Sequence, residues 1–166
     1  MRIELKEFVK LSSLSEDKRI KWRDFRNSTN KTKQAVVKEL VRFNQPYQIQ
    51  ESYVETHTET LEDFNPQYDD FFCEEPIIMF NGMRIYCYTN CLFIEIPVTK
   101  GKHTNYIAAM FDIHGDDARL DVSIMKKVAC NPQEFIDDCL QSYKNRQKYY
   151  ELQDKNNILA KKWKVK

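Results

Sequence analysis

Glycine is scarce in this sequence, with only three among 166 residues. Gly82, Gly101 and Gly115 each fall between two apolar, strand-like runs, where a tight turn needs positive φ angles. We therefore expect all three to occupy turns. None is left for a glycine-rich phosphate loop, a dinucleotide-binding fingerprint or the turn that presents a nucleophilic serine, so the sequence excludes enzymes that depend on these motifs.

Long apolar runs and a disulfide framework are also missing. No apolar run approaches the roughly 20 residues that cross a membrane, and the start of the chain, MRIELKEFVK, is too charged for a secretion signal. The five cysteines are odd in number and lack disulfide-like spacing, which predicts reduced thiols in a cytoplasmic protein. The closest pair, Cys87 and Cys91, has no second pair to complete a zinc site, so we expect no metal and no cofactor.

The residues that are present indicate one globular domain. The chain is 42% hydrophobic and 31% charged, which is a globular balance, and its length fits a single domain. Within this domain we distinguish four parts: a basic helical part at residues 1–45, an acidic arm with an edge strand and a loop at 46–76, an antiparallel sheet at 77–127 and a C-terminal helix at 131–160.

Helices are predicted at both ends of the chain. Ser13, followed by Glu16, has the spacing of a capping box before a helix. A second helix is expected over residues 31–43, after a turn in the polar sequence NSTNKT. The sequence NPQE at 131–134 places a capping asparagine before a proline and a third-position glutamate, a pattern that begins a helix.

The middle of the chain predicts strands. Alternation over residues 47–59 indicates an edge strand or protruding arm, with a loop at 61–75. Residues 77–88 form a hairpin pattern around an Asn-Gly turn. Further strand-like runs follow at 91–98, 105–113 and 118–126. The order predicts an α+β protein with N-terminal helices, an antiparallel meander sheet of four to five strands with one face covered, and a long C-terminal helix.

Charge is strongly segregated along the chain. Residues 43–83 contain nine carboxylates and no lysine or arginine, although the whole chain has a net charge of +1. Residues 1–42 hold twelve bases against six acids, and residues 84–166 hold fourteen bases against ten acids. Repulsion among nine neighbouring carboxylates is unfavourable, so they should face either the basic helices of the chain itself or a positively charged partner.

A basic partner explains this segregation better than internal pairing. Surface ion pairs contribute only about 0–1 kcal/mol each, whereas acids that steer an encounter and aromatics that anchor it suit a binding surface. We therefore expect a non-enzymatic inhibitor or regulator that engages a basic, nucleic-acid-handling protein as a nucleic-acid mimic. Small phage and plasmid inhibitors, anti-CRISPR proteins among them, use this strategy. The predicted contact residues are Glu51, Tyr53, Glu55, Glu59, Glu62, Asp63, Tyr68, Asp69, Asp70, Glu74 and Glu75.

Direct nucleic-acid binding is an alternative. Clusters of basic residues bind phosphate backbones by releasing counterions, and aromatic side chains among them can stack on bases unless they face the core. The candidate residues in the N-terminal helices are Lys18, Arg19, Lys21, Trp22, Arg23, Arg26, Lys31 and Lys33.

A small enzyme is a further alternative. Asp112 and His114 lie two apart on one predicted strand, and Asp121 lies on the next strand, so the three side chains can meet on the polar sheet face for acid/base catalysis or metal binding. A second such group shares one side of the predicted edge strand: Glu55, His57 and Glu59. Both groups also have an explanation without catalysis. The first can be charges that pair across an exposed sheet face, and the second can be charges that protect a sheet edge.

Overall fold

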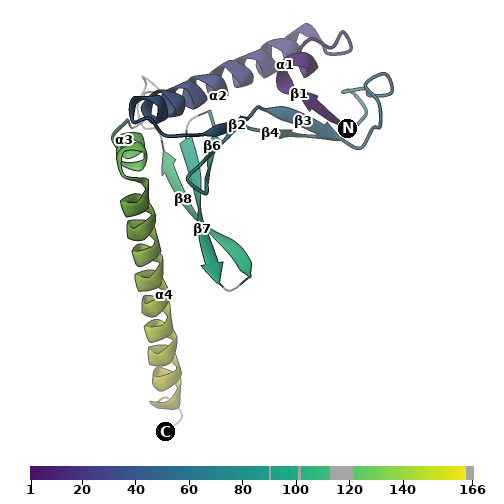
Figure 1. Ribbon diagram of the computed structural model, residues 1–166. Coiled ribbons are helices and arrows are strands. Elements are labelled where there is room, and N and C mark those ends of the chain that lie inside the picture. The colour runs from purple at the N-terminus through teal and green to yellow at the C-terminus, as the bar shows by residue number, and fades with distance from the viewer. Residues whose placement is uncertain (90, 101, 113–121, 164–166) are drawn as a thin grey trace.

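The computed structural model describes residues 1–89, 91–100, 102–112 and 122–163 of the chain (Figure 1). It combines a long N-terminal helix α2 (Glu16–Arg42), a five-stranded antiparallel sheet, a three-stranded second sheet and a long C-terminal helix α4 (Pro132–Trp163). The predicted α+β fold class is therefore confirmed.

The larger sheet is an antiparallel meander with one added edge strand. Its strand order is β2 (Gln48–Gln50), β5 (Ile77–Phe80), β6 (Met83–Cys87), β7 (Cys91–Lys100) and β8 (His103–Asp112). Strands β5 and β6 form the predicted hairpin, with Asn81 and Gly82 at φ angles of 47° and 77°. A type I′ turn needs positive φ at both central positions, and Asn-Gly adopts such angles with little strain.

One face of this sheet forms the main hydrophobic core. It packs against the C-terminal half of α2, helix α3 (Val122–Cys130) and the first turns of α4. Alternate residues of the strands fill this core, as a period-two pattern requires: Ile78, Phe80, Met83, Ile85, Cys87, Leu92, Ile94 and Ile96. The helices contribute Val36, Leu40, Met125, Val128, Phe135 and Ile136.

The smaller sheet builds a second core beside the N-terminal half of α2. Its strand order is β1 (Arg2–Glu4), β3 (Tyr53–Thr56) and β4 (Phe71–Glu74), with both pairings antiparallel. Helix α1 (Leu5–Phe8) and the first half of α2 lie against one face (Figure 1). The Phe8 ring is fully buried in this core, with its centroid 5.4 Å from that of Trp22 and 5.3 Å from that of Phe71.

The predicted turn at NSTNKT, which was expected to separate two helices, is wrong, because α2 runs without interruption through this sequence. Ser15, not Ser13, caps this helix and accepts a hydrogen bond from its first turn. Thr29 and Thr32 are buried, and their hydroxyls donate to backbone carbonyls three and four residues earlier. Since the helix backbone itself satisfies these hydroxyls, residues typical of a turn fit inside a helix.

Strand limits in the middle of the chain also differ from the prediction. The expected edge strand at 47–59 is divided into β2 and β3, which belong to different sheets, and part of the expected loop forms β4. Residues 122–126, predicted as part of a strand, begin helix α3, and residues 118–121 lie outside the described residues. Met125 and Val128 are buried at a helical spacing of three, and this burial outweighs the local alternation.

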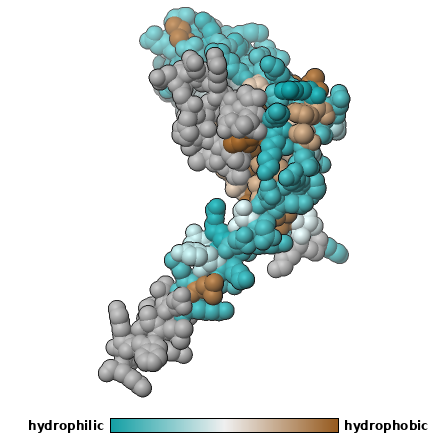
Figure 2. Space-filling model, turned by 90° about the vertical axis from the view of Figure 1, so that its left-hand side faces the viewer, coloured by the Kyte–Doolittle hydropathy of each residue, from teal (hydrophilic) through white to brown (hydrophobic). Residues whose placement is uncertain are grey.

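Helix α4 begins as predicted and then extends away from the rest of the molecule (Figure 1). The Asn131 side-chain nitrogen donates to the Glu134 carboxylate at 2.9 Å, and its side-chain oxygen accepts from the Glu134 backbone N–H at 3.4 Å, the bond expected of a capping asparagine. Residues 141–155 are all exposed, and the helix surface drawn in colour is mostly hydrophilic (Figure 2). Within the part of the chain that the structure describes, no helix has both the length and the hydropathy to cross a bilayer.

Candidate partner-binding surface

The predicted contact residues lie mainly on the acidic lobe, which we define as residues 51–75 and which comprises β3, β4 and their connecting loop. Alternate residues of β3 are buried in the small core, so Tyr53 and Glu55 point to the opposite side. The register places Phe72 across from Glu55 and Glu74 across from Tyr53. Cross-strand neighbours share a face, and these four side chains therefore form the outer face of the small sheet.

Contacts within the lobe hold its loop, residues 57–70, in shape. The Phe64 side chain is buried in the small core and anchors the middle of the loop. The Asn65 backbone N–H donates to the Asp69 carboxylate at 2.5 Å, and the Thr60 hydroxyl donates to the Asp63 carboxylate. Half-buried Asp69 thus has a structural role in the loop. The sequence had predicted it only as a residue that contacts the partner.

The lobe exposes both acidic and apolar side chains. Tyr68 is 82% exposed and Phe72 is 60% exposed, and Leu61, which is absent from the predicted contact set, is 46% exposed. Apart from Glu51, the exposed carboxylates of the lobe are Glu55, Glu59, Glu62, Asp63 and Asp70. A shallow pocket of about 340 Å³ lies among them, lined by Glu55, Thr56, His57, Asp70, Phe71 and Phe72. Acidic groups and apolar anchors are therefore combined on one surface.

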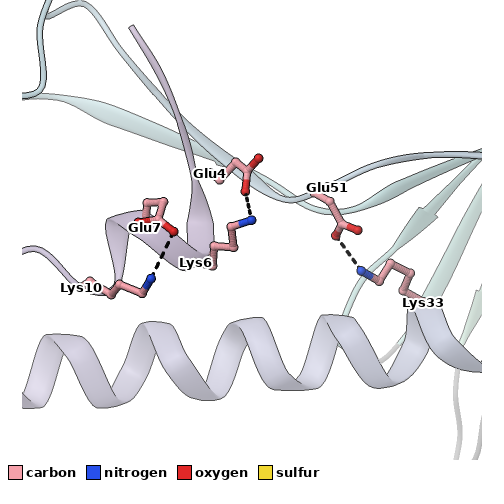
Figure 3. Close-up of polar contacts among 6 residues, drawn as sticks. All are labelled: Glu4, Lys6, Glu7, Lys10, Lys33 and Glu51. Atoms are coloured by element: carbon pink, nitrogen blue, oxygen red, sulfur yellow. Dashed lines mark hydrogen bonds and ion pairs between the residues drawn. The ribbon is translucent and has the colours of Figure 1, made fainter.

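Within the part of the chain that the structure describes, little of the lobe's negative charge is neutralised by ion pairs. The Lys33 ammonium group on α2 lies 2.6 Å from the Glu51 carboxylate (Figure 3). The other pairs in this view join residues 4–10 to one another (Figure 3). Among the described residues, Glu51 is the only one of the nine carboxylates in 43–83 that forms an ion pair. Glu51 therefore links the lobe to α2, and most of the other acids face solvent.

Tyr53 supports the surface from within the sheet. The Arg2 guanidinium carbon lies 3.3 Å from the centroid of the Tyr53 ring, in a cation–π arrangement. Burial raises the pKa of Tyr53, and the charge of Arg2 partly opposes this rise. The Arg2 side chain thus lies over the Tyr53 ring, whereas Tyr68 and Phe72 are the most exposed aromatic side chains of the lobe.

Glu74 and Glu75 are half-buried at the end of the lobe, and Glu75 carries a stability cost as a charged group. Burial raises the pKa of Glu75 above its ordinary value of 4.5, and neighbouring Glu74 acts in the same direction. The folded state therefore binds the Glu75 proton more tightly than the unfolded state does. The stabilising effect of this proton is complete below pH 4.5 and is lost as the pH rises through the folded-state pKa.

The variant Glu75→Gln is accordingly expected to raise the free energy of unfolding at pH 7, because glutamine cannot acquire the unfavourable buried charge. The gain should shrink on acidification and disappear below pH 4.5, where Glu75 is protonated in both states. Urea unfolding measured across this pH range tests the expectation. The exposed Glu62→Gln is the control and should show no such trend, and equal stability of Glu75→Gln and wild type at pH 7 contradicts the prediction.

The basic cluster on α2 is only partly free to bind nucleic acid. Lys18, Lys21, Arg23 and Lys31 are exposed. Arg19 pairs with Glu16 at 2.9 Å, Arg26 is half-buried, and Lys33 pairs with Glu51 in the lobe. The half-buried Trp22 ring packs against Phe8, Phe25 and Phe71 in the small core, which is the alternative to base stacking that the sequence left open.

The candidate catalytic group on the polar sheet face falls largely outside the described residues. Asp112 ends β8, whereas His114 and Asp121 are not described. Nearby on this face, the Glu95 carboxylate accepts from the Tyr86 hydroxyl at 3.2 Å and pairs with Arg84 at 2.6 Å. Glu95 is thus held in the kind of cross-strand pairing that a solvated sheet face uses.

The other candidate metal ligands do not converge. Strand β3 ends at Thr56, so His57 and Glu59 lie in the loop and do not continue the strand face that carries Glu55. Cys87 is buried in the main core, and burial raises its pKa to about 12, which disfavours the thiolate that zinc binds. Over residues 1–89, 91–100, 102–112 and 122–163, no group of three or more His, Cys, Asp or Glu side chains is placed to hold a metal ion.

Comparison with known proteins gives no family assignment: no protein-family model matches the chain, and no curated protein or solved structure matches it. The surface chemistry of the described residues is therefore the evidence that bears on function.

Proposed function

We propose that this protein is a non-enzymatic inhibitor or regulator that occupies the basic surface of a nucleic-acid-handling protein with its acidic lobe. The observation that carries the proposal is the combination of exposed, unpaired carboxylates with exposed Tyr68 and Phe72 on one preorganised surface. Aromatic side chains are common anchors of protein interfaces, and complementary charge accelerates the encounter.

The shape of the lobe favours binding over mere solubility. Its strands are paired, and its loop is anchored by the buried Phe64 side chain and by side-chain hydrogen bonds. A surface that is ordered before binding loses less conformational entropy in the complex. Charges placed only for solubility do not require exposed aromatic groups among them, since exposed apolar side chains oppose solubility.

The chemistry of the lobe also indicates the kind of partner. A protein groove that holds a phosphate backbone is lined by lysine and arginine and attracts any surface of dense negative charge. The block 43–83 offers nine carboxylates without a single lysine or arginine to repel such a groove. The proposal includes a cytoplasmic site of action, with reduced cysteines, no cofactor and no catalytic residues.

Capture followed by competition tests this function. The immobilised protein is exposed to a nuclease-treated lysate fraction that was retained on heparin, and a captured protein is identified and purified. We expect the purified partner to lose its DNA or RNA as the protein is added, because both ligands use the same basic surface. Two results overturn the proposal. One is that the immobilised protein retains no heparin-binding protein, and the other is that the partner binds nucleic acid unchanged when it is saturated with the protein.

A further inference from the structure

The free part of helix α4 carries lysines along one face. Lys144, Lys148, Leu152 and Lys155 follow one another at intervals of four, four and three residues, and all four are exposed. Residues three and four apart in a helix lie on the same side. These four residues therefore form one continuous surface, which we call the lysine face of α4 and which covers about 16 Å of the helix.

The lysine face points away from the rest of its own molecule. Cys139 packs against the main core, and Lys148 and Lys155 lie nine and sixteen residues after it. These spacings correspond to about two and a half and four and a half helical turns, so both lysines lie on the side of α4 opposite Cys139. Because residues 141–155 are all exposed and α4 extends beyond the two sheets (Figure 1), a second molecule can reach this face.

The positive charge of the lysine face is not compensated by ion pairs within the described residues. Glu151 borders the face, and Asp137 lies seven residues before Lys144 and accepts a hydrogen bond from Gln133. Neither carboxylate forms an ion pair with a described lysine of this face. Residues 139–150 contain three basic residues and no acidic one. The face therefore keeps a net positive charge that a partner can meet.

The acidic lobe of the same protein has the complementary chemistry. Its exposed carboxylates lie on one surface with exposed Tyr68 and Phe72. The lysines of α4 match these carboxylates, and Leu152, which is 52% exposed, matches the apolar side chains among them. Opposite charges attract and orient two such surfaces before they touch.

The two surfaces of one molecule cannot meet each other. Strands β3 and β4 of the lobe and the free part of α4 lie at opposite ends of the molecule (Figure 1). Helix α4 is continuous from Pro132 to Trp163, so its free part does not fold back onto the lobe. A contact between the two surfaces must therefore join two copies of the chain.

We infer that the lysine face of α4 in one copy binds the acidic lobe of a second copy. The carboxylates of the loop 57–70 receive the lysines, and Leu152 rests against Phe72. Because the two surfaces differ, successive copies form an open chain or a closed ring. The contact itself is independent of the proposed function. Its consequence, that self-association covers the lobe until a partner displaces the second copy, rests on that function.

A nucleic acid suits the lysine face less well than the lobe does. A phosphate backbone attracts lysines, but it offers no apolar group to Leu152 in the middle of the face. The lobe supplies both kinds of contact, since it combines carboxylates with exposed aromatic rings.

Sedimentation velocity of the purified protein tests the contact directly. About 16 Å of helix is less than a standard stable interface needs, so we expect a dissociation constant on the order of 100 μM at low salt. Raising the ionic strength from about 0.05 to about 0.5 M should weaken the association at least tenfold, because salt screens exposed charges. A wild-type protein that stays monomeric up to about 500 μM, or associates more strongly in high salt, overturns the inference.

Charge exchange between the two surfaces identifies them. The α4 variant Lys148→Glu, Lys155→Glu and the lobe variant Glu59→Lys, Glu62→Lys should each self-associate at least tenfold more weakly than wild type. An equimolar mixture of the two variants should associate about as well as wild type. In the mixture each acidic helix meets a lobe with reversed charge, and each remaining lysine face meets an acidic lobe.

The control reverses two exposed lysines outside the lysine face. Lys21→Glu, Lys31→Glu on α2 makes the same change in net charge as the α4 variant and should alter self-association by no more than about twofold. Equal weakening by this control, or a mixture that stays monomeric, overturns the inference. These measurements use the purified protein alone, so their failure leaves the proposed function standing, and failure to capture a partner leaves the contact between copies standing.

Discussion

Reversing three exposed charges of the acidic lobe, in the variant Glu59→Lys, Glu62→Lys and Asp70→Lys, is expected to weaken partner binding by about a hundredfold. Each reversal removes an attraction and adds a repulsion. With about 0.5 kcal/mol for each effect, the total loss is about 3 kcal/mol. All three residues lie in the loop 57–70 and are exposed, so the fold should be retained.

The control for this variant keeps the change in net charge and moves it elsewhere. Asp137→Lys, Glu151→Lys and Asp154→Lys reverse three exposed carboxylates of α4. The dissociation constant of the purified partner, measured by calorimetry at two salt concentrations, should hardly change for this control. Equal weakening by the two triple variants would mean that the partner senses overall charge only, and would contradict a specific role of the lobe.

The second large effect concerns the stability of the core behind the lobe. Phe8→Ala is expected to lower the free energy of unfolding by about 3–5 kcal/mol, the usual cost of truncating a buried phenylalanine. The ring is fully buried, and its centroid lies 5.3–6.0 Å from those of Trp22, Phe64 and Phe71. Its loss therefore leaves a cavity at the meeting point of α1, α2 and the lobe.

Urea unfolding followed by circular dichroism measures this loss. Phe72→Ala is the matched control, because Phe72 belongs to the same small sheet but points outward, and its cost should stay within about 0.5 kcal/mol. If Phe8→Ala fails to fold, the milder Phe8→Leu should still cost more than Phe72→Ala. Equal costs for inward and outward positions would contradict the described division of the small sheet into a buried and an exposed face.

Features that depend on neighbouring residues were predictable from the sequence. The Asn81–Gly82 turn follows from the φ angles that these two residues tolerate, and the cap at Asn131 follows from the spacing to Glu134. The α+β class followed from the order of such local patterns. The local pattern failed at NSTNKT, which lies within α2. The hydroxyls of buried threonines there donate hydrogen bonds to carbonyl groups of the helix backbone, and composition does not reveal this pairing.

The candidate surface was predictable in composition and not in detail. The acidic block and its aromatic side chains are visible in the sequence, but Phe71 and Phe72 look alike there. Pairing of β4 with β3 turns Phe71 toward the small core and Phe72 toward solvent. Adjacent strand residues point to opposite faces, so the partner strand and the helices behind it decide which phenylalanine is an anchor.

The sequence by itself determined the charge segregation, the shortage of glycine, and the local signals that begin helices and turns. Only the tertiary structure decided which acids are free. Glu51 is neutralised by Lys33, eighteen residues earlier, and Asp69 is tied to the loop backbone, whereas Glu55, Glu59, Glu62 and Asp70 face solvent. The reason is physical: exposure and pairing depend on contacts between residues far apart in the chain, and a periodic pattern places a side chain only relative to its own helix or strand.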